Sequence, residues 1–231
     1  MAKKDCLQLT IAIDGPAGAG KSTIAKMVAE RLKYKYIDTG AMYRALTWQA
    51  LQHGINWDDE TELLNLLRKN RLEFVSCHRH GQHLYLNGEN IDPYLRLPQV
   101  EQKVSLVASN PKIRKELVNL QRELAAGGGV VMDGRDIGTV VLPDADLKIF
   151  LTASLQERAR RRYVQFAADA PLESIEEIEK KLAIRDKLDR ERKSGPLQQA
   201  SDAIHIDTTG YTPEQVVEQI IALWEERRCK S

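Results

Sequence analysis

The chain has 231 residues, of which 42% are hydrophobic and 29% are charged, and its formal net charge is +1. This length suits one α/β domain with insertions, and the hydrophobic fraction is enough for a sizeable core. The near-zero net charge gives no reason to expect binding to nucleic acid or to a membrane surface. The three cysteines lie far apart and form no pairwise motif, so we expect free thiols in a reducing compartment.

The chain shows no sign of targeting to a membrane or to a secretory route. Its first residues have no apolar core of the kind found in a signal peptide. No apolar stretch approaches the ~20 residues that a membrane span needs. We therefore expect a soluble cytoplasmic protein, and we expect it to be a monomer because nothing in the sequence argues strongly for a dimer.

The first predicted elements are a strand over Leu9–Asp14 and a helix over Ser22–Leu32, and the segment between them has the P-loop pattern. Its glycines let the backbone N–H groups point at phosphate oxygens, and the helix N-terminus adds partial positive charge. We expect Lys21 to reach the terminal phosphates and the Ser22 hydroxyl to bind Mg²⁺. A plain glycine-rich turn is the alternative, but it gives no reason for a lysine and a serine there. The candidate residues for binding the nucleoside triphosphate are Gly15, Pro16, Ala17, Gly18, Ala19, Gly20, Lys21, Ser22 and Thr23.

A second strand is predicted over Tyr34–Asp38, and it leads into the sequence Asp-Thr-Gly-Ala-Met-Tyr-Arg, which ends at Arg44. Ligands of open α/β sheets bind at the carboxyl ends of the strands, so this loop should open toward the P-loop. Arg44 lies early on the following helix and is placed to bind a second phosphate group. The alternative is that Asp38 or Thr39 only caps that helix.

From Leu72 to Leu97 the apolar residues alternate with period two, and Asn87-Gly88 is a hairpin signal, which together predict a small antiparallel insertion. The segment Cys77–His83 contains three histidines, but its spacing matches no zinc site. We interpret that segment as a solvated loop. A helix is predicted next, over Pro111–Ala126.

A strand over Val130–Asp133 precedes the sequence Asp-Gly-Arg-Asp-Ile-Gly-Thr. Asp133 is a candidate partner of Mg²⁺ through a water molecule, and the alternative is a carboxylate that caps a turn. Arg135 and Asp136 place two opposite charges in a glycine-flanked loop at the same edge of the sheet, which is typical of a binding site.

The segment from Ala153 to Ser194 lies between strands predicted over Lys148–Leu151 and Ala203–Asp207, and it is dense in arginine and in acidic residues. Arg185 and Asp189 share a helical face, which alone favours an ordinary surface helix with ion pairs. Its position in a P-loop protein instead favours a mobile lid that carries arginines to phosphate. The last predicted helix, Pro213–Glu226, begins with Thr212 as its N-cap.

Short apolar strands that alternate with helical segments are typical of an α/β fold. We predict a P-loop parallel sheet flanked by helices, with a small antiparallel insertion and a helical lid, in a single domain. The predicted core covers residues 1–70, 98–152 and 195–231, the insertion about 71–97 and the lid about 153–194.

Together these motifs resemble the bacterial cytidylate kinases, which phosphorylate CMP and dCMP with ATP and Mg²⁺. The resemblance covers essentially the whole chain, and its specificity comes from the combination of the P-loop with the Gly-Arg-Asp-Ile-Gly-Thr loop and the insertion. It implies that Ser105, Arg114 and Asp136 read the cytosine base. It also implies substrate-binding roles for Thr39, for Tyr43 beside the base, for Arg44, Arg135 and Arg192 at the phosphate, and for Arg185 and Asp189 at the ribose and the lid. The catalytic residues implied are Lys21, Arg158, Arg162 and Arg192, with Arg158 and Arg162 facing the ATP phosphates.

Two alternatives remain open from the sequence. One is another small-molecule P-loop kinase, acting on UMP, shikimate or dephospho-coenzyme A, against which the insertion and the Gly134-Arg135-Asp136 loop argue. The other is a nucleotide-binding switch or regulatory module, which needs an effector loop and a water-positioning residue. We find no convincing guanine-reading Asn-Lys-x-Asp motif in the sequence.

Overall fold

The structure is a computed structural model that describes residues 8–77, 81–166 and 173–230, and over these residues the chain forms two compact units. Unit 1 is drawn from Met1–Tyr36 and Ala125–Ser231, and unit 2 is Ile37–Leu124. The elements of unit 1 are β1 (Thr10–Asp14), α1 (Lys21–Leu32), the first half of β2 (Lys35–Asp38), β6 (Val130–Gly134), the short π-helical turn η2 (Ile137–Val141), β7 (Leu147–Thr152), α6 (Leu155–Phe166), α7 (Ile175–Glu191), β8 (Ile204–Asp207) and α8 (Pro213–Lys230).

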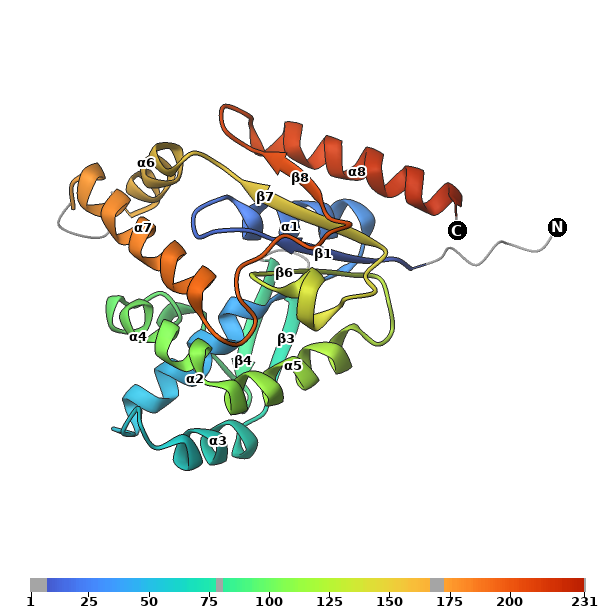
Figure 1. The fold of residues 1–231 in the computed structure, drawn as a ribbon. Helices are drawn as coiled ribbons and strands as arrows, with labels where there is room; N and C mark the ends of the chain where they lie inside the picture. The colour runs from blue at the N-terminus through green and yellow to red at the C-terminus, as the bar shows by residue number, and fades with distance from the viewer. Residues whose placement is uncertain (1–7, 78–80, 167–172, 231) are drawn as a thin grey trace. The chain divides into compact units, whose positions relative to one another are not determined.

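A five-stranded sheet with the order β2-β6-β1-β7-β8 forms the centre of unit 1. The pairs β1–β6, β1–β7 and β7–β8 are parallel. The strands are runs of buried aliphatic residues, as expected where both faces of a parallel sheet are covered. Helices α1 and α8 lie side by side (Figure 1), and Val28 and Ile220 from these helices join Ile13 and Ile149 of the sheet in one apolar core. The predicted P-loop sheet flanked by helices is therefore confirmed.

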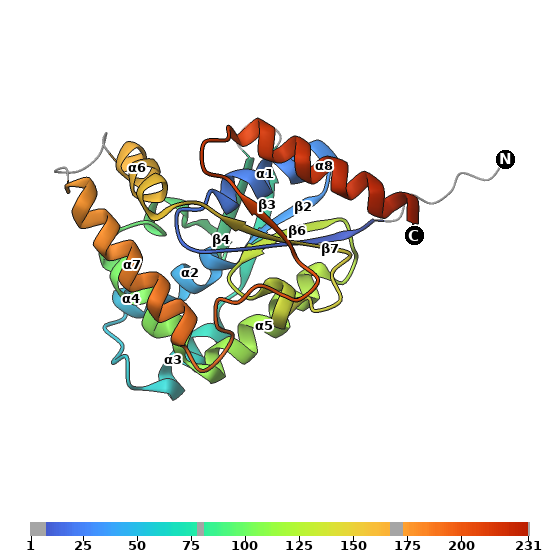
Figure 2. The same cartoon turned by 45° about the horizontal axis from the view of Figure 1, so that its top comes forward.

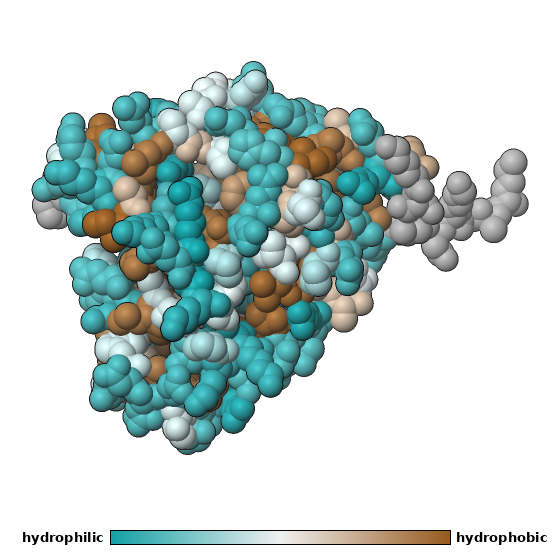
Figure 3. Space-filling model, viewed as in Figure 1, coloured by the Kyte–Doolittle hydropathy of each residue, from teal (hydrophilic) through white to brown (hydrophobic). Residues whose placement is uncertain are grey.

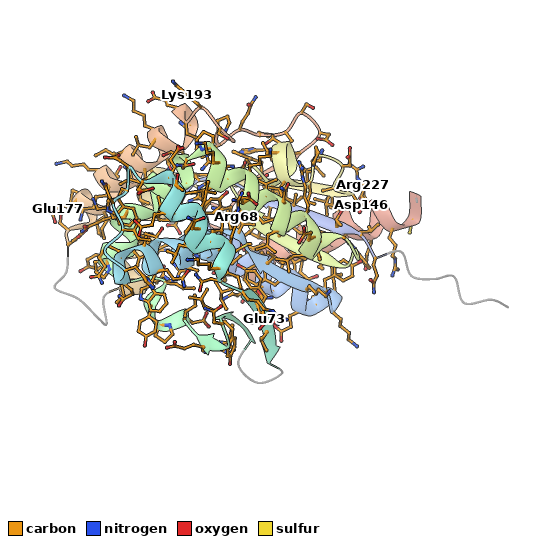
Figure 4. All side chains as sticks on the ribbon, turned by 90° about the horizontal axis from the view of Figure 1, so that it is seen from below. Arg68, Glu73, Asp146, Glu177, Lys193 and Arg227 are labelled. Carbon is orange, nitrogen blue, oxygen red and sulfur yellow. The ribbon has the colours of Figure 1, made fainter. Side chains whose placement is uncertain are left out.

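The order of the strands places a functional edge at the carboxyl end of β1. The chain leaves β1 through α1 toward β2 on one side, whereas β7 pairs with β1 on the other side. Sheets of this kind bind ligands where the strand order diverges in this way. The register of β1 and β6 pairs Ile13 with Asp133 and Asp14 with Gly134, so both carboxylates lie beside the P-loop. At the opposite end, Asp146, which is labelled in Figure 4, lies just before β7. Its carboxylate accepts hydrogen bonds from the Thr10 backbone N (2.7 Å) and Oγ1 (2.8 Å).

The predicted lid contains two helices of unit 1, α6 and α7, which lie side by side (Figure 2). Ala159 of α6 and Ile178 and Leu182 of α7 are buried against Ala17 of the P-loop. The start of α7 is fixed by a capping box, in which Ser174 and Glu177 bond each other's backbone N–H groups. Two helices with many charged side chains are thus held next to the P-loop by a small apolar contact.

Unit 2 contains a three-stranded antiparallel sheet with the order β3-β4-β5. Asn87 (φ 51°) and Gly88 (φ 87°) both adopt left-handed backbone conformations between β4 and β5, as a tight hairpin turn requires. The predicted small antiparallel insertion is therefore confirmed. Helices pack on its apolar residues and on one another. The elements of unit 2 are α2 (Thr39–Gln52), α3 (Glu60–Lys69), β3 (Leu72–Cys77), β4 (Gly81–Leu86), β5 (Glu89–Asn90), the 3-10 turn η1 (Asp92–Tyr94), α4 (Pro98–Ser109) and most of α5 (Pro111–Ala125).

The predicted boundaries of the insertion and the lid fall inside these two units. Residues 71–97 belong to unit 2, together with helices that the sequence assigned to the core, and the described part of 153–194 belongs to unit 1. Division into core, insertion and lid as moving parts stays a prediction. The last helix, α8, continues to Lys230, beyond its predicted end at Glu226, because neither glycine nor proline stops it there.

Candidate active site

The P-loop connects β1 to α1 with the backbone geometry of an anion cradle. Gly20 precedes α1 with φ 88°, a left-handed conformation that glycine adopts without a steric penalty. Gly15 has φ 148°, and a Cβ built on it would lie 2.0 Å from the Leu151 carbonyl oxygen of β7. Both positions therefore require glycine, and the loop directs backbone N–H groups and the positive end of α1 toward one point.

Lys21 is buried at the start of α1, with 6% of its surface exposed. Its Nζ donates a hydrogen bond to the Pro16 carbonyl oxygen at 2.7 Å. Burial, followed by the positive charge of Arg135, lowers the pKa of Lys21 to about 7, against the attraction of Asp133 and Asp14. A bound polyphosphate would place negative charge beside Lys21 and so favour its protonated form. The site is therefore electrostatically suited to an anion.

Ser22 and Asp133 provide the oxygen atoms expected of a magnesium nucleotide site. The Ser22 hydroxyl donates to Asp133 Oδ2 at 2.9 Å, and the Tyr36 hydroxyl donates to Asp133 Oδ1 at 2.7 Å. Mg²⁺ prefers oxygen donors, keeps several waters and takes few ligands from the protein when phosphates are present. A serine hydroxyl with a carboxylate beside it fits that ion. The alternative role of Asp133, capping a turn, does not describe these two contacts.

A buried carboxylate that the sequence analysis treated only as the end of a strand lies at the same edge. Asp14 accepts hydrogen bonds from the backbone N–H groups of Ile137 (2.8 Å) and Gly138 (2.7 Å). Burial raises the pKa of Asp14 to about 6, although these two hydrogen bonds act in the opposite direction. Asp14 thus connects the end of β1 to the start of η2, next to the Gly134–Asp136 loop.

The predicted acceptor-binding residues of unit 1 form an alternating chain of charges. Arg135 Nε donates to Asp189 Oδ2 at 2.8 Å, and Arg192 contacts both Asp136 (3.3 Å) and Asp189 (3.9 Å). Burial raises the pKa of Asp189, but the charge and hydrogen bond of Arg135 outweigh it and hold that pKa below its usual range. Arg185 lies one turn before Asp189 on α7 and is half-buried. The structure therefore brings these five residues together, rather than leaving α7 as a plain surface helix.

Two arginines of α6, Arg158 and Arg161, donate hydrogen bonds to backbone carbonyl oxygens of the P-loop. Arg158 donates to the Ala17 carbonyl oxygen at 3.0 Å and pairs with Asp186 of α7 at 2.7 Å. Arg161 donates to Thr208 Oγ1 at 2.9 Å and to the Thr208 carbonyl oxygen at 2.7 Å. Arg162 is half-buried on the same helix. In this structure Arg158 donates to a carbonyl and a carboxylate, and its predicted contact with ATP phosphates, like that of Arg162, stays a prediction.

The predicted residues of unit 2 lie on three helices. Asp38 accepts from the Ala41 backbone N at 2.8 Å, which caps α2, and from Arg44 at 2.9 Å, so capping and an arginine contact coexist. The Arg114 guanidinium lies 5.7 Å from the centre of the Tyr43 ring, a cation–π arrangement. Arg114 is 3% exposed and donates to the Ala108 carbonyl oxygen at 3.2 Å. Thr39 is buried at the start of α2, and Ser105 is half-buried on α4.

The histidine-rich segment falls partly outside the described residues. His78 and His80 are not described, so the interpretation of that segment as a solvated loop stays a prediction. His83 is described, and its Nδ1 lies 2.7 Å from Asp92 Oδ2. This pair joins β4 to η1 within unit 2.

Comparison with known protein families decides between the kinase alternatives. The profile of the family described as cytidylate kinase matches residues 11–226. The chain belongs to the cytidylate kinase family. As a member of this family the chain is a phosphotransferase enzyme, and the predicted resemblance is confirmed.

Relatives and solved structures agree with this assignment. The cytidylate kinase of Geobacillus kaustophilus is 53% identical over 220 residues, covering 95% of this chain and 98% of that protein. The cytidylate kinase of Ligilactobacillus salivarius is 50% identical over 220 residues, with the same coverage. The crystal structure of an uncharacterised protein from Eubacterium ventriosum is similar in fold, with a TM-score of 0.52 and 15% identity over 95% of this chain and 99% of that chain.

The surface is rich in polar side chains, in keeping with the 29% of residues that are charged. The face drawn in Figure 3 is mostly hydrophilic, and its apolar residues are scattered among polar ones. Within the described residues, no helix has the length and apolar character needed to cross a membrane.

Sequence reasoning missed four residues that the structure places at the site: Asp14, Tyr36, Arg161 and Asp186. Asp14 and Tyr36 could have been suspected, because an aspartate and a tyrosine in otherwise apolar strands need hydrogen-bonding partners when buried. Arg161 and Asp186 stand in segments with many charges, where nothing local separates them from their neighbours.

Proposed function

We propose that this chain transfers the γ-phosphoryl group of ATP to CMP or dCMP and so forms CDP or dCDP. The observation that carries the proposal is the buried Lys21 at the head of a P-loop, in a chain of the cytidylate kinase family. The γ-phosphoryl group would lie at the start of α1, where the backbone N–H groups and Lys21 neutralise its charge. Bound Mg²⁺, held by Ser22 and through water by Asp133, would add charge neutralisation on the phosphates.

The chemistry needs no dedicated general base, because the acceptor is already a phosphate oxyanion. The protein has to align this oxyanion with the γ-phosphoryl group and to balance the negative charge of two anionic substrates. As the resemblance to the family implies, we assign the acceptor phosphate to Arg44, Arg135 and Arg192. The ion pairs of these arginines with carboxylates hold the guanidinium groups in place before the substrate arrives.

Selection of cytosine follows from its hydrogen-bonding edge. Cytosine presents an amino donor at position 4 and acceptors at N3 and O2, whereas uracil has the opposite polarity at position 4 and N3. A carboxylate such as Asp136 accepts from the amino group, Ser105 adds a hydroxyl, and an arginine such as Arg114 donates to the ring acceptors. Uracil would present a donor or an acceptor of the wrong kind to these groups and would form fewer hydrogen bonds with them, which disfavours it. We assign Thr39 and Tyr43 to the surroundings of the base and Arg185 and Asp189 to the ribose.

The proposal is tested by measuring ADP release from ATP and Mg²⁺ with CMP, dCMP, UMP, AMP or no acceptor. We expect high kcat/KM with CMP and dCMP, a much lower value with UMP and AMP, and almost no release without an acceptor. Highest activity with another acceptor would place the chain among other P-loop kinases. Release that is independent of any acceptor would indicate a nucleotide hydrolase. Monomeric state and cytoplasmic location stay predictions, and sedimentation at enzyme concentrations used in the assay tests the first.

A further inference from the structure

We infer that Tyr36 is a positioning residue for the magnesium nucleotide and that it acts through Asp133. The inference rests on the proposed function, because it assumes that Ser22 and Asp133 bind the magnesium ion of MgATP. Tyr36 is 5% exposed on β2, the strand next to β6, which ends with Asp133 and Gly134. The sequence motifs of the site do not include this tyrosine.

The contacts of Asp133 define its orientation. The carboxylate is 3% exposed, and its two oxygens face different elements: Oδ1 accepts from the Tyr36 hydroxyl of β2, and Oδ2 accepts from the Ser22 hydroxyl of α1. The distances, 2.7 Å and 2.9 Å, are those of good hydrogen bonds to an ionised acceptor. With Oδ1 fixed by the phenol, rotation of the carboxylate group is opposed, and Oδ2 stays directed at the serine.

That orientation matters because the ion would bind the Ser22 oxygen atom. A serine that ligates Mg²⁺ through its oxygen lone pair still has a proton to donate, and Asp133 is placed to accept it. Groups that orient a metal ligand in this way affect metal affinity by about 10- to 100-fold when they are removed. Tyr36 contacts Asp133 and not the serine that would bind the ion. Removal of its hydroxyl should therefore weaken Mg²⁺-dependent binding of the nucleotide by about tenfold, at the lower end of this range.

The test is the substitution Tyr36→Phe, which removes the hydroxyl and keeps the ring. The ring packs in the core of unit 1, with Lys26 Nζ 5.7 Å from its centre, and a phenyl ring preserves both features. Tyr34→Phe is the matched control, because Tyr34 packs against the same core of unit 1. The Tyr34 hydroxyl accepts from the Leu9 backbone N at 3.1 Å and from Trp224 Nε1 at 3.3 Å, so its removal also breaks hydrogen bonds in unit 1 but leaves Asp133 unchanged.

Affinity for a non-hydrolysable ATP analogue is measured by calorimetry with excess Mg²⁺ and with EDTA, for wild type and both variants. We expect the ratio of the two affinities to fall about tenfold in Tyr36→Phe and to stay at the wild-type value in Tyr34→Phe. In steady-state assays, Tyr36→Phe should raise KM for MgATP and the Mg²⁺ concentration needed for half-maximal activity, while KM for CMP stays the same.

Two results separate failure of this inference from failure of the proposed function. If Mg²⁺ strengthens analogue binding equally in wild type and in Tyr36→Phe, Tyr36 has only a structural role and the inference is overturned. If Mg²⁺ does not strengthen binding in wild type at all, the assignment of the magnesium site to Ser22 and Asp133 is overturned as well. Equal losses in Tyr36→Phe and Tyr34→Phe would also overturn the inference, because they would reflect a general effect of removing a hydroxyl from unit 1.

Discussion

The buried carboxyl group of Asp14 should make the stability of this protein depend on pH between the acid range and neutrality. Burial raises its pKa from 3.8 to about 6 in the folded state. Between these two values the folded protein holds a proton that the unfolded chain releases, so the stabilisation is fully present below the lower value and is lost as the pH rises through about 6. The shift corresponds to about 3 kcal/mol in total, and about 1 kcal/mol of it is lost between about pH 5 and about pH 8.

The substitution Asp14→Asn removes the titration. An amide keeps one oxygen acceptor for the backbone N–H groups of Ile137 and Gly138, and the cost of losing the other acceptor is the same at every pH. Free energies of unfolding from urea titrations at several pH values, for wild type and variant, give a difference in which the titrating groups that do not interact with Asp14 cancel. Relative to the variant, wild type should lose about 1 kcal/mol from about pH 5 to about pH 8. Two parallel stability curves, or a difference of the opposite sign, would refute this account of Asp14.

Three further predictions concern activity. Lys21→Met should abolish transfer while thermal unfolding stays cooperative, and near-native turnover would show that the P-loop assignment is wrong. Because the pKa of Lys21 is about 7 in the free protein, binding of an ATP analogue at about pH 8 should also be accompanied by uptake of a proton in wild type but not in this variant. Amide exchange in α6 and α7 should slow when an ATP analogue and CMP are bound together, and unchanged exchange would mean that these helices form a static surface. Asp136→Ala and Arg114→Ala should each reduce the ratio of kcat/KM for CMP to kcat/KM for UMP. The expected loss of discrimination is roughly 1–3 kcal/mol for each lost contact. Equal losses for the two substrates would place the base-reading group elsewhere, at Ser105 or in the insertion.

The local pattern of the sequence was enough to predict much of this protein. Apolar runs next to helical segments located the strands of the parallel sheet, and Asn87-Gly88 located the turn of the small antiparallel sheet. The P-loop pattern predicted the position of Lys21 at the start of a helix. These features depend on residues close together in the chain, where backbone geometry and periodicity determine the structure.

The partners of the charged residues were decided only by tertiary structure. On helical spacing alone Asp189 faces Arg185, yet its close ion pair is with Arg135, which is 54 residues away. Arg158 likewise forms an ion pair with Asp186 of another helix, whereas the nearby Arg160 forms an ion pair with Glu157 of its own helix at the surface. In a segment with many arginines and acids, each side chain has several local partners of similar energy in water. Burial removes that equivalence, because a charge without a close partner is costly there, and only the packing of distant elements determines which charges become buried together.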